Sequence, residues 1–129
     1  MAAGAAVCLL LFGATPSFSA ERYALIITGA SGGEAYQQKY DRWRATFLST
    51  LRERFGYQND RLLVLAETES EGVQQATRAN VQRVLGDLRH KLTKDDQLLV
   101  MLIGHGTPMD GEDAKFNLDR KSTRLNSSH

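Results

Sequence analysis

Residues 97–107 read Gln-Leu-Leu-Val-Met-Leu-Ile-Gly-His-Gly-Thr, and this stretch decides the fold. Its first seven residues, 97–103, form the most hydrophobic run after the N-terminal segment and predict a strand of a parallel sheet. The run ends in a histidine, His105, between two glycines. Because ligands bind beyond the carboxyl ends of the strands in open parallel sheets, His105 is the first candidate for a functional residue.

The residues before this stretch alternate between strand and helix patterns. The expected elements are a buried strand 23–28, a glycine loop 29–33, a helix 35–55 ended by Gly56, a strand 61–65, a polar loop 67–75, and a helix that begins at Thr77 or Asn80. Alternation at this spacing predicts right-handed crossovers and a parallel sheet. We therefore expect an α/β fold in three layers, with helices on both faces of a parallel sheet.

Both helices have an apolar face that is expected to pack on the sheet. In the first helix this face is an aromatic stripe at three- and four-residue spacing, made of Tyr36, Tyr40, Trp43, Phe47, Leu51 and Phe55. In the second helix the buried positions are expected to be Val81, Val84, Leu85, Leu88 and Leu92. The stripe is interpreted as core packing rather than as a ligand site.

The chemistry expected at the strand ends centres on His105. An imidazole can act as a general acid and base near neutral pH, and the amide of Gly106 could donate to a developing oxyanion. The flanking glycines would let a substrate backbone come close. A structural loop histidine is the competing explanation of the same residue.

The order of these elements resembles the caspase–hemoglobinase fold of clan CD cysteine peptidases. Asp95-Asp96 before the strand and residues 103–107 at its end resemble the histidine motif of legumain-type (C13) peptidases and their bacterial relatives. The resemblance covers residues 23–118. It implies the N-terminal half of a peptidase domain that hydrolyses peptide bonds through a Cys–His dyad, with peptides or proteins as substrates.

The resemblance also implies roles for single residues. His105 and Gly106 match the catalytic histidine and the following oxyanion amide, whereas the cysteine would lie beyond Leu118. Gln37 and Gln38 match the positions that help to build the specificity pocket. Ala35 stands where the family has an asparagine that supports the histidine, so an inactive, peptidase-like binding module is a second function that fits the sequence.

Three further interpretations rest on single motifs. Residues 28–33 resemble the dinucleotide loop of NAD(P)-dependent short-chain dehydrogenases, although Ala35 replaces the last glycine and Glu34 would face the phosphates. His105-Gly106 could be the oxyanion loop of an α/β-hydrolase. Asp110, Glu112 and Asp113 could bind a metal ion, but their spacing matches no complete calcium loop. No cofactor or metal is therefore expected.

Both ends of the chain are expected to lie outside the domain. Residues 1–20 resemble a secretory signal, which predicts an exported, periplasmic or extracellular protein with no membrane contact after cleavage. Cys8 is the one cysteine and lies inside that segment, so no disulfide is expected in the mature chain. Residues 119–129 resemble a translated sequencing adapter and are taken as a non-native tail, leaving residues 21–118 as a truncated domain.

The net charge of the chain bears on the class of partner that it could bind. The chain has 129 residues and a formal net charge of +1, which gives no reason to expect nucleic-acid binding. The sequence does not predict an oligomeric state.

Overall fold

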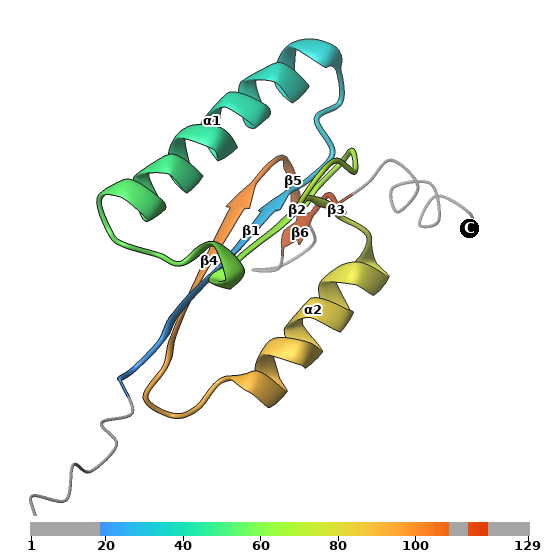
Figure 1. The fold of residues 1–129 in the computed structure, drawn as a ribbon. Coiled ribbons are helices and arrows are strands. Elements are labelled where there is room, and N and C mark those ends of the chain that lie inside the picture. Colours follow the sequence, from blue (N-terminus) through green and yellow to red (C-terminus); the bar gives the residue numbers. More distant parts are fainter. Residues whose placement is uncertain (1–18, 109–113, 119–129) are drawn as a thin grey trace, which may run out of the picture.

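The computed structural model describes residues 19–108 and 114–118, and these form a parallel α/β unit (Figure 1). The elements in chain order are β1 (Arg22–Thr28), α1 (Glu34–Glu53), a short 3-10 helix (Asn59–Arg61), β2 (Leu62–Ala66), β3 (Gln74–Gln75), α2 (Arg78–Lys91), β4 (Gln97–Ile103), β5 (Gly106–Pro108) and β6 (Ala114–Phe116). The signal segment, Cys8 and the adapter-like tail lie outside the described residues, apart from Ser19 and Ala20.

The main sheet has the order β3-β2-β1-β4, and all of its neighbouring strands are parallel. The central strand β1 pairs with β4 along its whole length, from Arg22 beside Gln97 to Thr28 beside Ile103. The chain thus passes from β1 to β2 on one side and then crosses to β4 on the other. The expectation of a parallel α/β sheet is confirmed, and the expected strand 97–103 has the bounds of β4.

Each face of the sheet carries one helix and one group of buried side chains (Figure 1). On the α1 face, Tyr40, Leu48 and Leu51 pack against residues of β1 and β2 that include Ile26 and Val64. On the α2 face, Val84 and Leu88 pack against alternate residues of the same strands: Tyr23, Leu25, Ile27 and Leu65. Because successive side chains of a strand point to opposite faces of the sheet, β1 and β2 contribute residues to two separate hydrophobic cores.

The helix faces differ in part from those expected. Tyr40 and Leu51 are buried and Phe47 is partly buried, but Tyr36, Trp43 and Phe55 are at least half exposed. Helix α1 ends at Glu53, so Phe55 lies beyond it, and Gly56 supplies the left-handed turn (φ +66°) that follows. In α2, Thr77 is the N-cap and accepts a hydrogen bond from the Asn80 amide at 3.1 Å. Leu85 is 43% exposed because Val84 and Leu88 take the positions that face the sheet.

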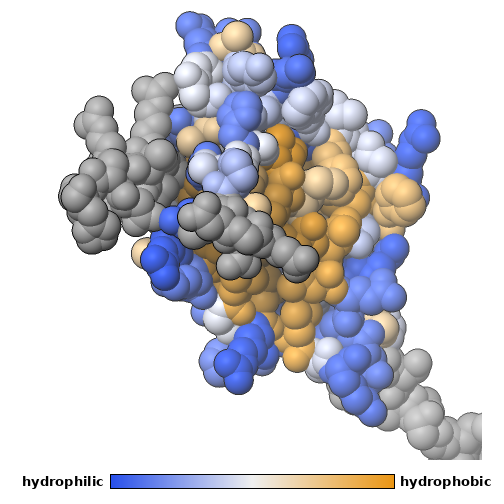
Figure 2. Space-filling model, turned by 180° about the vertical axis from the view of Figure 1, so that it is seen from behind, coloured by the Kyte–Doolittle hydropathy of each residue, from blue (hydrophilic) through white to orange (hydrophobic). Residues whose placement is uncertain are grey.

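Strand β4 is an edge strand of the described sheet, and it is exposed over most of its length. Its exposed apolar side chains are Leu98, Leu99, Val100 and Leu102. Figure 2 shows an apolar area on the side of the molecule turned away from the view of Figure 1. Neither α1 nor α2 covers this edge, although the sequence of β4 is that of a strand buried on both faces.

Two features were not expected from the sequence. The short strand β3 lies inside the segment expected to be a polar loop, and β5 and β6 form an antiparallel hairpin directly after His105. Among the described residues, no helix is long and apolar enough to cross a membrane.

Candidate functional site

His105 follows the carboxyl end of β4 and is exposed to solvent. The glycine loop after β1 lies at the same edge, because the amide of Gly29 donates to the carbonyl oxygen of Ile103 at 2.9 Å. The parallel pairing of β1 with β4 thus places the two expected site segments side by side. Ligands of open parallel sheets bind at this edge, so a ligand bound there could contact His105.

The imidazole of His105 lies against two tyrosine rings of α1. Its centroid is 5.1 Å from that of Tyr36, at an interplanar angle of 73°, and 5.8 Å from that of Tyr40, at 57°. These are favourable distances and angles for aromatic contact. Among residues 19–108 and 114–118, no side chain or backbone group hydrogen-bonds the imidazole.

Burial and the neighbouring Tyr36 phenol raise the pKa of Tyr40 above its ordinary value, so Tyr40 stays neutral. Its ring is therefore an uncharged surface beside His105.

Gly104 and Gly29 both lie against the segment that follows His105. A Cβ on Gly104 would lie 2.9 Å from the ring of Phe116, and a Cβ on Gly29 would collide with the carbonyl oxygen of Asn117. Phe116 and Asn117 belong to the hairpin segment, which is tied down by a 2.8 Å hydrogen bond from the Ala30 amide to the Asn117 oxygen. The missing side chain at Gly104 therefore makes room for the ring of Phe116.

Gly106 lies in β5, opposite Phe116 of β6. The Asn117 amide donates to the His105 carbonyl at 3.0 Å, which makes residues 105 and 117 a hydrogen-bonded pair. Antiparallel ladders alternate, so the Gly106–Phe116 pair is not hydrogen-bonded and the Gly106 amide points away from β6. By this alternation, no described residue of β6 accepts a hydrogen bond from the Gly106 amide.

A pocket of about 170 Å³ lies under α1 at the carboxyl ends of β1 and β2. Tyr40 and Gly29 line it, so it adjoins the surroundings of His105. Of the two glutamines singled out from the sequence, Gln37 lines the pocket and donates to Thr68 Oγ1 at 3.3 Å. Gln38 is exposed and donates to Glu34 along the helix at 3.4 Å.

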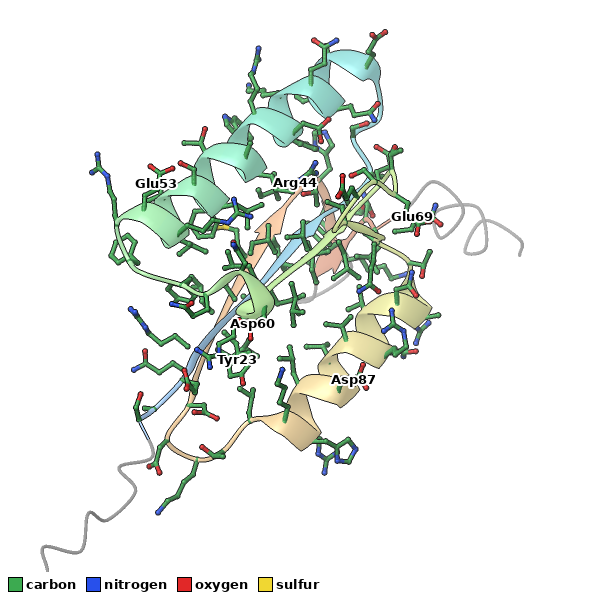
Figure 3. All side chains as sticks on the ribbon, in the orientation of Figure 1. Tyr23, Arg44, Glu53, Asp60, Glu69 and Asp87 are labelled. Carbon is green, nitrogen blue, oxygen red and sulfur yellow. The ribbon has the colours of Figure 1, made fainter. Side chains whose placement is uncertain are left out.

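The charged residues of this pocket were missed from the sequence. Arg44 projects from α1 toward the strand ends (Figure 3), where its guanidinium meets Asp41 at 2.9 Å and donates to the Thr28 hydroxyl at 3.4 Å. Glu67 accepts two hydrogen bonds from Ser31, from the hydroxyl at 2.7 Å and from the amide at 3.0 Å. The lining thus holds two carboxylates and one guanidinium.

Two sequence signals could have found these residues. Glu67 is the first residue after a strand, a position that lies at the ligand-binding edge of a parallel sheet. Arg44 follows Gln37 and Tyr40 by seven and four residues, which places all three on one helix face.

Asp96 lies at the other end of β4 and takes no part in the site. Its carboxylate accepts hydrogen bonds from the Glu21 amide at 2.7 Å and the Thr93 amide at 2.8 Å. These bonds, first from Thr93 and then from Glu21, lower its pKa. Asp96 therefore fixes the entry into β4 and does not orient His105.

Within the described ranges, no group of three or more histidine, cysteine or acidic side chains could hold a metal ion. Asp110, Glu112 and Asp113, considered above as metal ligands, lie outside the described residues.

No known protein-family model matches the chain, and no curated protein matches its sequence.

Proposed function

We propose that residues 21–118 are the N-terminal half of a caspase-like cysteine-peptidase domain, of the legumain type, in an exported protein. In this proposal His105 is the acid–base residue, and the thiol nucleophile follows the next strand beyond Leu118. The observation that carries the proposal is the position of the exposed His105 directly after β4, at the carboxyl edge of the parallel sheet where the loop after β1 also lies.

The proposed reaction assigns one task to each group. The cysteine thiolate attacks the peptide carbonyl, so that an S–C bond forms while the C–N bond breaks. His105 gives its proton to the departing amine and later takes a proton from the water that hydrolyses the thioester. The Gly106 amide could donate to the oxyanion because it points away from β6.

The pocket beneath α1 supports a side-chain subsite for the substrate. It adjoins His105 through Tyr40, and Gln37 contributes an amide to it. Because Asp41 and Glu67 outnumber Arg44, the lining favours neutral polar or basic side chains over acidic ones. Gln38 does not line this pocket and donates a hydrogen bond to Glu34 along the helix.

A second candidate function is an inactive, peptide-binding relative of such enzymes. It is favoured by the lack of a hydrogen-bonded partner for the His105 imidazole among the described residues, together with Ala35 at the position of the supporting asparagine. Dinucleotide binding is less favoured, since the hairpin fills the space beside Gly29.

The experiment that separates these functions uses the uninterrupted gene that encodes residues 21–118. The complete protein is treated with a thiol-reactive peptide probe and its labelling is followed by intact mass. We expect a single labelled cysteine, with labelling slowed about 10²-fold by His105→Ala, the lower end of what acid–base catalysis contributes. The matched control is His90→Ala, on the exposed surface of α2. Equal labelling of the wild type and His105→Ala would overturn the proposal, and absence of a reactive cysteine would favour the binding module.

A further inference from the structure

The contacts of His105 identify what holds its ring in place. Tyr36 and Tyr40 are four residues apart on α1, so their rings lie on successive turns of one helix face, with centroids 6.1 Å apart. The imidazole contacts both rings at once. Its backbone is fixed separately, by the hydrogen bond from the Asn117 amide to its carbonyl oxygen.

We propose that Tyr36 and Tyr40 are positioning residues that hold the His105 imidazole in one orientation through ring contacts. The inference rests on the proposed function of His105 as the acid–base residue. Proton transfer to a leaving group needs one ring nitrogen aimed in a fixed direction, and a freely turning imidazole would present that nitrogen only part of the time. With no hydrogen bond to the ring among the described residues, the two tyrosines are the groups that restrict it.

The two tyrosines contribute differently. Tyr40 is only 4% exposed and belongs to the core cluster that includes Ile26 and Ile103, so it is a fixed support. Trp43 packs against the Tyr40 ring at 5.9 Å. Tyr36 is half exposed, and its ring meets the imidazole near edge-on. It can therefore be replaced without opening the core.

The test measures the imidazole itself and needs no catalytic activity. The chain is labelled with isotopes at histidine, and the ring signals of His105 are compared with those of His90, an exposed histidine on α2. Both signals are assigned from His105→Gln and His90→Gln variants. We expect nuclear Overhauser contacts from the His105 ring to both tyrosines, and a ring-proton shift displaced from that of His90.

The informative variant is Tyr36→Leu. It should move the His105 ring shift more than halfway toward that of His90 and increase the averaging of its side-chain couplings, with the backbone spectrum of the core unchanged. Tyr36→Phe keeps the ring and should preserve the wild-type signals. Phe55→Leu is the matched control, because Phe55 is an aromatic residue of similar exposed fraction (56% against 50%) just after the same helix, and among the described residues it makes no ring contact with Tyr36, Tyr40 or His105.

Two results would overturn the inference. One is a His105 signal that Tyr36→Leu leaves unchanged, and the other is an equal displacement of that signal by Phe55→Leu. Tyr40→Phe is a second test that keeps the buried ring, and it should preserve the His105 shift. The NMR result does not depend on the peptide-probe experiment. If the variants confirm the ring contacts but His105→Ala leaves probe labelling intact, the positioning of His105 stands and the peptidase proposal is wrong.

Discussion

The carbonyl oxygen of Asn117 occupies the space that a Cβ on Gly29 would need. The hairpin after His105 is therefore seated on the glycine loop after β1, and the Ala30 amide holds it there. This contact joins the loop after β1 to the segment after His105, the two regions identified as candidate site segments from the sequence. It also explains why residue 29 has no side chain.

Gly29→Ala should unseat the hairpin from the sheet edge. Because the clash is with backbone and not with the end of a flexible side chain, we expect a loss of about 1–3 kcal/mol in the free energy of unfolding. Urea unfolding measures the loss, and the amide signals of residues 105–108 and 114–117 should shift with it. A variant as stable as the wild type, with unchanged hairpin signals, would contradict the contact.

Gly86→Ala is the matched control and should have the opposite sign. Gly86 lies inside α2, and a Cβ there would meet no atom of the described residues within 4 Å other than those of its own helix turns. Alanine removes the entropic cost of a helical glycine, so stability should rise by about 0.5–1 kcal/mol. A decrease in the same urea experiment would show that α2 is packed more tightly at this point than described.

Asp96 makes the free energy of unfolding depend on pH in the acidic range. Hydrogen bonds from the Thr93 and Glu21 amides favour its ionised form, so its pKa in the folded state lies below the ordinary 3.8. The stabilisation is present above that ordinary value and is lost as the pH falls through the lower folded pKa.

Asp96→Asn should weaken this acid-induced loss of stability, as measured by urea unfolding from pH 6 to pH 2. The adjacent Asp95→Asn removes a similar charge and should leave the loss in place, because Asp96 is retained. An unaltered pH profile in Asp96→Asn would argue against the two amide contacts.

The exposed edge of β4 should make this chain self-associate. Its four exposed apolar side chains stand on a strand with no charged residue between 98 and 103. Within residues 19–108 and 114–118, no strand pairs with its outer side, which is a template for pairing with another chain. Val100→Lys should reduce concentration-dependent association in sedimentation velocity. Leu85→Lys is the control, with a similar exposed fraction (43% against 47%) but a place on α2. Equal effects of both substitutions would rule out the β4 edge as the cause.

The strands and helices could be predicted from the sequence because their signals are local. The apolar run that forms β4 and the capping residue Thr77 specify their elements without reference to the rest of the chain. The exposure of Tyr36 and Trp43 could not be predicted in this way. Periodicity shows which residues share a helix face, but how much of that face is buried depends on the width of the sheet beneath it. The described sheet is narrow on the β4 side, where Leu99 on the α1 face is itself 37% exposed.

The position of the candidate site could be predicted, but its surroundings could not. His105 and the loop after β1 meet because parallel strands end at one edge. The hairpin was missed because β5 and β6 have three residues each, too few for a periodic pattern. The contacts of Glu67 with Ser31 and of Arg44 with Thr28 join segments 36 and 16 residues apart, and no local pattern encodes such pairs.

The rate of peptide hydrolysis by the complete protein that contains residues 21–118 most directly tests the acid–base role that we propose for His105. The measurement is kcat/KM for an internally quenched peptide, in the wild type, in His105→Gln and in the control His90→Gln. We predict that His105→Gln lowers kcat/KM by about 10²–10⁴-fold, the contribution of a positioned acid–base group, while His90→Gln does not. A complete protein that cleaves peptides equally well without His105 would contradict this role.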